Sequence, residues 1–232
     1  MSTTKTLRIR RTEGHIDEFV VTAGRYTTLL DGLEEIRSGD DRSLVYRHSC
    51  HHGSCGTCGA LVNGERVLAC LTRLAELPAV SVVEPLSPFP LVADLAVDPR
   101  ALYERFPPDA GYLRPSEVNP GAGVPDEIAG YTRFENCIEC GLCVSACPVQ
   151  RAFVGPAALA AYGRELEKHP ERGGELLRQI DTADGVWACD RALACSATCP
   201  LGVAPARHIA VLQRKARALR QNRESVESDS SH

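Results

Sequence analysis

The chain has 232 residues, enough for one or two domains, and its formal charge of −4 gives no reason to expect nucleic-acid binding. No apolar run approaches the ~18 residues of a membrane span, so we expect any membrane association to go through partner proteins. The eleven cysteines are an odd number, so a disulfide framework cannot use them all, and no apolar signal-peptide core precedes them.

The basic, hydroxyl-rich N-terminus can be interpreted as a transit peptide or as a first strand. We favour a strand over residues 6–11, because Leu7 and Ile9 alternate with polar residues. Acidic residues return at Glu13 and Asp17, which is not typical of a transit peptide.

A second strand, over residues 16–22, and a helix, over residues 28–37, are predicted next. The helix has apolar residues at helical spacing. Thr27 or Thr28 is the expected N-cap, and residues 38–40 (Ser-Gly-Asp) form a stop signal.

A cysteine-rich loop at residues 50–59 precedes a hairpin that turns at Asn63 and Gly64, a strong two-residue turn signal. The predicted strands here are 60–62, 65–69 and 80–84. Strand, strand, helix, loop, hairpin and strand is the element order of a β-grasp ferredoxin domain.

Four cysteines in this region follow the plant-type [2Fe–2S] spacing, C-x4-C-x2-C-x11-C. They are Cys50, Cys55, Cys58 and Cys70. A loop that wraps a small cluster closely needs residues without side chains, and Gly53, Gly56 and Gly59 meet this need. The sequence therefore predicts a [2Fe–2S] cluster on these four thiolates.

Two histidines, His51 and His52, raise the alternative of a Rieske site, because Cys50-x-His52 begins like one. A Rieske site also needs a second Cys-x2-His, and that position is Cys58. We therefore expect both histidines to line the loop surface, where they could tune the cluster's potential or meet a partner.

Residues 85–125 form a connector that holds nine of the fifteen prolines. Proline stiffens a linker and would hold two cluster domains at a fixed separation. One short helix is expected at residues 91–105.

The C-terminal half is predicted to be helical, with helices over residues 156–168, 174–180 and 205–222. Pro156 suits the first position of a helix. The third helix has an apolar face formed by Ile209, Leu212, Ala216 and Leu219. Its basic face is either solvated or attracted to anionic lipid headgroups. We expect the tail from Glu224 to be disordered.

Two segments with the same cysteine spacing lie in this half of the chain. The first has cysteines at 137, 140, 143 and 147, followed by Pro148. The second has cysteines at 189, 195 and 199, followed by Pro200, with Ala192 at the remaining step. C-x2-C-x2-C-x3-C-P is the bacterial iron–sulfur run, whose fourth cysteine ligates the other cluster of a pair.

If the fourth cysteine of each run ligates the cluster of the other run, the ligands of both clusters are assigned. The predicted [4Fe–4S] ligands are Cys137, Cys140, Cys143 and Cys199. The second set has three thiolates, Cys147, Cys189 and Cys195, and its open corner at Ala192 predicts [3Fe–4S]. Four, four and three ligands account for all eleven cysteines. A structural zinc module also uses C-x2-C pairs but does not explain two ferredoxin spacings.

These motifs together resemble the iron–sulfur subunit of succinate dehydrogenase and fumarate reductase, over nearly the whole chain. Besides the cysteines, residues 62–64, 68–70, 153–158 and 185–189 look like that family. The resemblance implies an α+β protein of two domains. They are a plant-type [2Fe–2S] ferredoxin domain at 1–106 and an all-α bacterial dicluster ferredoxin domain at 107–232.

The resemblance also implies a function in the respiratory chain and tricarboxylic acid cycle. The chain would relay electrons between the FAD of a flavoprotein subunit and a quinone, without taking part in the dicarboxylate chemistry. Membrane-anchor subunits, which can bear haem, would hold it at the cytoplasmic face of a bacterial membrane. The alternatives are the same role in a thiol-linked fumarate reductase or another flavin dehydrogenase.

The quinone end departs from the best-known ubiquinone-reducing members. Residues 149–152 lack their Trp pair, and Asp190 stands where they have His. Pro148 matches the quinone-site proline, and Trp187 either lines that site or packs in the core. We favour packing for Trp187, and menaquinone as the partner quinone.

Overall fold

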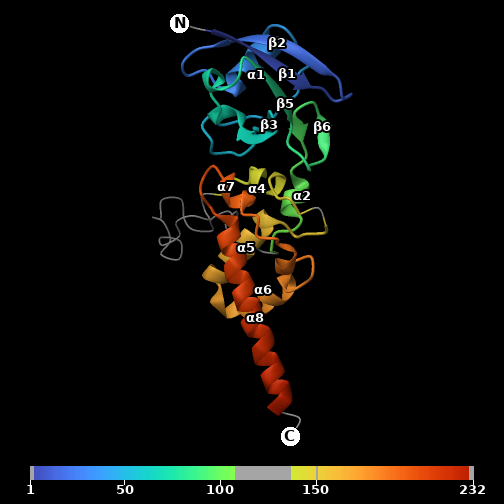
Figure 1. Cartoon of the computed structure of the whole chain (residues 1–232), viewed down its shortest axis with the longest axis vertical. Helices are drawn as coiled ribbons and strands as arrows, with labels where there is room; N and C mark the ends of the chain where they lie inside the picture. Colours follow the sequence, from blue (N-terminus) through green and yellow to red (C-terminus); the bar gives the residue numbers. More distant parts are fainter. Residues whose placement is uncertain (1–2, 108–136, 150, 230–232) are drawn as a thin grey trace, which may run out of the picture. The chain divides into compact units, whose positions relative to one another are not determined.

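The computed structural model describes residues 3–107, 137–149 and 151–229 (Figure 1). The chain divides into two compact units. The first comprises Met1–Ala101 together with Ile138–Ser145, and the second comprises Leu102–Cys137 and Ala146–His232. The expected domain boundary at residues 106 and 107 stays a prediction. Part of the expected proline-rich connector, residues 108–125, lies outside the described residues.

The first unit is built on a mixed five-stranded sheet of order β2-β1-β5-β3-β4. Its strands are β1 (Thr3–Arg10), β2 (Ile16–Ala23), β3 (Gly59–Val62), β4 (Glu65–Leu68) and β5 (Val80–Pro85). Strand β1 pairs antiparallel with β2 and parallel with β5. Leu7 and Ile9 are fully buried, so the predicted alternation in the first strand is confirmed.

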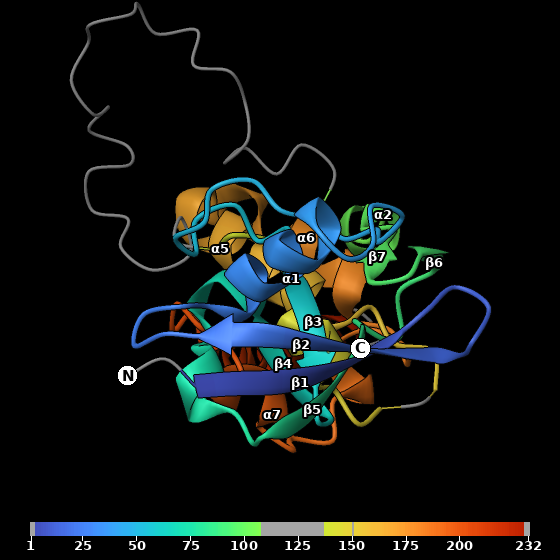
Figure 2. The same cartoon turned by 90° about the horizontal axis from the view of Figure 1, so that it is seen from above.

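Helix α1 (Leu29–Ser38) packs its apolar stripe on one face of this sheet (Figure 2). Of the two expected caps, Thr27 and Thr28, the N-cap is Thr28. Its hydroxyl accepts a hydrogen bond from the Asp31 amide while the Asp31 carboxylate accepts one from the Thr28 amide. Such a reciprocal box satisfies two backbone donors at the helix start. The helix ends at Ser38, with Gly39 as its C-cap, within the predicted stop signal.

The predicted hairpin turn at Asn63 and Gly64 is confirmed, because both residues have positive φ, +51° and +82°. After β4, two short 3₁₀ turns, η1 (Ala69–Leu71) and η2 (Leu74–Glu76), lead to β5. The first of these turns carries Cys70.

The expected helix within residues 91–105 is wrong over its first half. There β6 (Leu91–Ala93) and β7 (Ala96–Val97) form a small hairpin, and only α2 (Arg100–Tyr103) is helical. The hairpin turns at Asp94, whose buried carboxylate accepts hydrogen bonds from the backbone amides of Thr12 and Val45. Thr12 and Val45 lie 82 and 49 residues from Asp94 in the sequence, so distant contacts favour the hairpin over a helix here.

Residues 138–145 pack against the sheet of the first unit and end in α4 (Leu142–Ser145). Leu142 is 1% exposed and belongs to the same apolar core as α1 and the strands. Arg66 on β4 donates hydrogen bonds to the hydroxyl and the carbonyl of Ser145, at 3.4 and 3.2 Å. The segment is thus held by both apolar and polar contacts.

The described part of the second unit is helical. Its elements are α5 (Pro156–Lys168), η4 (Pro170–Arg172), α6 (Gly173–Ile180), η5 (Val186–Ala188), α7 (Ala194–Ala197) and α8 (Pro205–Asp229). The predicted apolar face of α8 is buried from Ile209 to Ala216 against α5 and α6. Pro156 stands in the first turn of α5, as expected.

Helix α8 continues beyond its predicted end. Residues 224–229 are helical, so the expectation of a disordered tail from Glu224 is wrong up to Asp229. Extending an existing helix adds one hydrogen bond for each residue that is fixed, so a polar sequence can continue it. Among the described residues no helix, α8 included, is apolar enough over a sufficient length to cross a membrane.

Candidate cluster-binding sites

The loop after Cys50 wraps its backbone around that cysteine's sulfur. The amides of Ser54 and Cys55 donate to Cys50 Sγ at 3.2 and 3.3 Å. Gly53 and Gly56 have φ of +77° and +69°, which side-chain-bearing residues rarely adopt, so the glycines permit this path. Several amides directed at one sulfur favour its thiolate form.

Cys58 and Cys70 lie close together at the buried side of this site, with their sulfurs 3.4 Å apart. Two thiolates on one tetrahedral metal ion, bound at ~2.3 Å, lie about 3.7 Å apart. The pair is therefore close to the spacing required to share one iron. Cys50, Cys55 and Cys58 come from one loop of the first unit, and Cys70 comes from the 3₁₀ turn that follows the hairpin.

The two sides of the site differ in electrostatics. Hydrogen bonds from backbone amides, that of His52 foremost, lower the pKa of the half-buried Cys50 thiol to about 6. Burial raises the pKa of Cys58 to about 12. Metal binding requires thiolates, so a cluster has to displace the proton of Cys58 that burial retains.

The second unit brings three cysteines and one alanine into a common cavity. It is lined by Cys147, Cys189, Cys195 and Ala192, together with Pro148 and Asp190. Burial raises the pKa values of Cys147 and Cys195. Arg191 and Leu193 have positive φ of +58° and +60°, so the chain bends around the cavity on both sides of Ala192.

The other four cysteines occur as two pairs. Cys137 and Cys199 both pack against a small apolar cluster of the second unit, which contains Ala160, Ala161 and Val203. Cys140 and Cys143 lie in the segment 138–145 that packs within the first unit.

The residues expected near the quinone occupy two places. Pro148 and Asp190 line the cavity, whereas Trp187 is not among its lining residues. The Trp187 indole donates to Asp181 at 2.7 Å and packs against the core of the second unit. The guanidinium groups of Arg217 and Arg220 lie 5.3 and 5.0 Å from its ring centre.

Sequence reasoning did not single out the partner of Asp190. Arg151 pairs with the Asp190 carboxylate and also donates to the Ala188 carbonyl at 2.6 Å. The signal was an arginine three residues after Pro148, but the pairing spans 39 residues and depends on the fold.

Comparison with known proteins decides the family. A model of the 2Fe-2S iron–sulfur cluster binding domain matches residues 4–104, and a model of the 4Fe-4S dicluster domain matches residues 133–203. The fumarate reductase iron–sulfur subunit of Mycobacterium tuberculosis is 37% identical over 198 residues, covering 81% of this chain and 80% of the relative. The chain belongs to the family of iron–sulfur subunits of fumarate reductase and succinate dehydrogenase.

Other members give the same picture. The fumarate reductase iron–sulfur subunit of Escherichia coli O157:H7 is 37% identical, over 79% of this chain and 78% of its own. The succinate dehydrogenase iron–sulfur subunit of Coxiella burnetii is 32% identical, over 83% and 85%. A chain of the Mycobacterium smegmatis Sdh1 complex superposes with a TM-score of 0.76 at 26% identity, over 93% and 96%.

These findings confirm the predicted fold class and the [2Fe–2S] and [4Fe–4S] cofactors of this iron–sulfur subunit. The [3Fe–4S] cluster, the ligand assignments and the residues near the quinone stay predictions.

Proposed function

We propose that this subunit relays electrons between the FAD of a flavoprotein subunit and a quinone, in a succinate:quinone oxidoreductase. Membership of the family supports the role, and the cavity that unites three cysteines with Ala192 carries the proposal. It is a cluster site with one protein ligand fewer than a cubane needs, in a chain whose other eight cysteines make two complete sets.

The [2Fe–2S] cluster is assigned to Cys50, Cys55, Cys58 and Cys70. The sulfur spacing of Cys58 and Cys70 supports their sharing one iron, and the amides directed at Cys50 offset the charge of its thiolate. Iron–sulfur clusters supply one-electron carriers, whose potentials depend on hydrogen bonds to sulfur and on solvent exposure.

The [3Fe–4S] cluster is assigned to Cys147, Cys189 and Cys195, whose common cavity supports a shared site. The [4Fe–4S] cluster is assigned to Cys137, Cys140, Cys143 and Cys199 by the spacing of the two runs. Residues 1–106 then serve the first cluster and residues 107–232 serve the other two.

The quinone is assigned to the [3Fe–4S] end, near Pro148 and Asp190. Pairing with Arg151 leaves the Asp190 carboxylate little net charge to present to a neutral quinone. Menaquinone is the proposed partner, with Trp187 as a packing residue. Anchor subunits, with or without haem, hold the assembly at the cytoplasmic face of a bacterial membrane.

Electron paramagnetic resonance of the purified complex tests this proposal. The oxidised complex should give a [3Fe–4S] signal, and full reduction should give two further species. Ala192→Cys should remove the oxidised-state signal and raise the iron content by one atom per chain. An oxidised wild type without the signal contradicts the assignment at Ala192. Absence of succinate–dye reductase activity would instead indicate another flavin dehydrogenase.

A further inference from the structure

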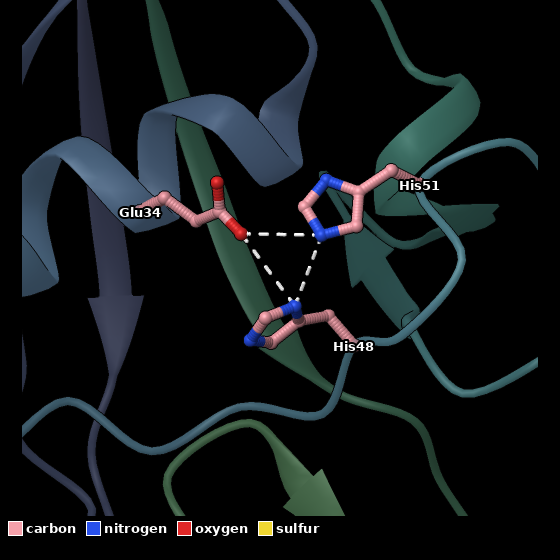
Figure 3. Close-up of side chains that lie close together, drawn as sticks. All are labelled: Glu34, His48 and His51. Atoms are coloured by element: carbon pink, nitrogen blue, oxygen red, sulfur yellow. Dashed lines mark hydrogen bonds and ion pairs between the residues drawn. The ribbon is translucent and has the colours of Figure 1, made fainter.

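Three side chains of types that can bind a metal ion converge in the first unit, apart from the cysteines. Figure 3 shows Glu34 on α1 pointing toward His48 and His51. The two histidines lie in one loop, on either side of Cys50 in the sequence. Glu34 Oε1 lies 3.5 Å from His48 Nδ1 and 3.3 Å from His51 Nε2, and the two nitrogens are 3.2 Å apart. The three ligand atoms thus form a nearly equilateral triangle.

The size of this triangle fits a tetrahedral ion. Zinc binds histidine nitrogen and carboxylate oxygen at ~2.0–2.2 Å, so in a tetrahedron two such ligand atoms lie about 3.3–3.6 Å apart. An octahedral magnesium ion, with bonds of ~2.0–2.1 Å, places adjacent ligands only about 2.8–3.0 Å apart. The observed edges of 3.2, 3.3 and 3.5 Å match the tetrahedral case better.

Hydrogen bonds alone do not account for all three contacts. A ring nitrogen of neutral histidine carries either one proton or one lone pair. If both nitrogens donate to Glu34, no hydrogen bond joins the two nitrogens, which lie 3.2 Å apart. If one nitrogen donates to the other, the acceptor has no proton left for Glu34. A dication at the centre satisfies the three lone pairs at once.

The supporting structure holds each ligand from a separate direction. Glu34 stands on α1, whose start is fixed by the capping box at Thr28. The His48 ring packs against Tyr46, with ring centres 5.2 Å apart. His51 adopts φ of +62°, a conformation that non-glycine residues seldom adopt and that aims its ring at the other two.

The site is open to solvent. The side chains of Glu34, His48 and His51 are 38%, 33% and 42% exposed, so an ion can enter and keep a water as its fourth ligand. Three protein ligands with one open position is the arrangement of accessible zinc sites.

We propose that Glu34, His48 and His51 bind one divalent transition-metal ion of the zinc type, separate from the iron–sulfur clusters. Bound there, the ion links α1 to the loop around Cys50. Because it binds the folded chain, it also stabilises the first unit against unfolding.

Equilibrium dialysis of the cluster-loaded full chain against Zn²⁺, with Mg²⁺ in excess, tests this proposal. Zinc and iron are then measured in the same sample. We expect one zinc per chain with unchanged iron, and an affinity weakened about tenfold or more by Glu34→Gln and by His48→Asn. His51 is left intact because it adjoins Cys50.

His15→Asn is the matched control, since His15 is an exposed histidine that faces one carboxylate, Asp17, at 3.6 Å. It should bind zinc as the wild type does. Wild type without zinc, equal binding by wild type and His48→Asn, or zinc taken up at the expense of iron would each overturn the proposal. Iron content reports the clusters separately, so their failure is distinguishable from failure of this site.

Discussion

Gly56→Ala should destabilise the first unit at the point where the [2Fe–2S] loop meets the segment carrying Cys140. A Cβ built at Gly56 lies 2.0 Å from the Ile138 carbonyl oxygen and 3.0 Å from the Cys140 amide nitrogen. Real Cβ atoms essentially never approach within 3.0 Å, so the Ile138 backbone has to retreat by at least about 1 Å.

The cost has two parts. A left-handed conformation costs a residue with a side chain roughly 1–2 kcal/mol, and Gly56 has φ of +69°. Overpacking adds about 1–3 kcal/mol. Gly64→Ala separates these parts, because Gly64 has φ of +82° and a Cβ there meets nothing within 4 Å. The difference between the two variants therefore measures the close approach alone.

Thermal melting of the cluster-loaded chain, with iron analysis, provides the measurement. Since 1 kcal/mol shifts the melting temperature of a unit this size by ~4–8 °C, Gly56→Ala should melt at least about 4 °C below Gly64→Ala. It should also lose iron sooner on heating. Melting of the two variants within about 2 °C of each other would refute the contact.

Three further changes test other parts of the structure. Asp94→Ala removes the buried carboxylate that accepts the partly buried hydrogen bonds from the amides of Thr12 and Val45, and should lower the free energy of unfolding by about 2–3 kcal/mol; a loss under 1 kcal/mol in denaturant titration contradicts this. Thr57→Val removes a hydroxyl 3.1 Å from Cys55 Sγ and should lower the [2Fe–2S] potential by tens of millivolts, roughly; an unchanged potentiometric titration rejects that role. Burial lowers the pKa of His208, so between that pKa and ~6.5 the unfolded chain binds more protons, and stability falls as the pH drops below about 6.5. His208→Gln should flatten this dependence in melting curves from pH 8 to 5.5, and an equally steep fall in the variant argues against it.

The sequence predicted the features that depend on neighbouring residues. The cap at Thr28, the turn at Asn63 and Gly64, and the apolar face of α8 each arise from a local pattern. Within each cysteine run the spacing is local too, because most ligands of one cluster lie a few residues apart in the sequence. These patterns sufficed for the fold class and for the two cofactors that the family models confirm.

Features that depend on distant residues were missed. The hairpin of β6 and β7 turns at Asp94, whose buried carboxylate is stabilised by donors from residues 12 and 45. Helix α8 continues beyond the end of its apolar face, because adding residues to an existing helix does not require their burial. His48 and His51 lie three residues apart in one loop, but no sequence spacing connects them with Glu34 on α1.

The division into compact units does not follow the division into family models. The dicluster model begins at residue 133, yet residues 138–145 pack within the first unit. Cys140 and Cys143 therefore lie in the same compact unit as the [2Fe–2S] loop, held by the contacts of Gly56 with Ile138 and of Arg66 with Ser145. Packing inside one unit therefore places Cys140 and Cys143 in the same body as that loop, without any contribution from the stiffness of the proline-rich connector.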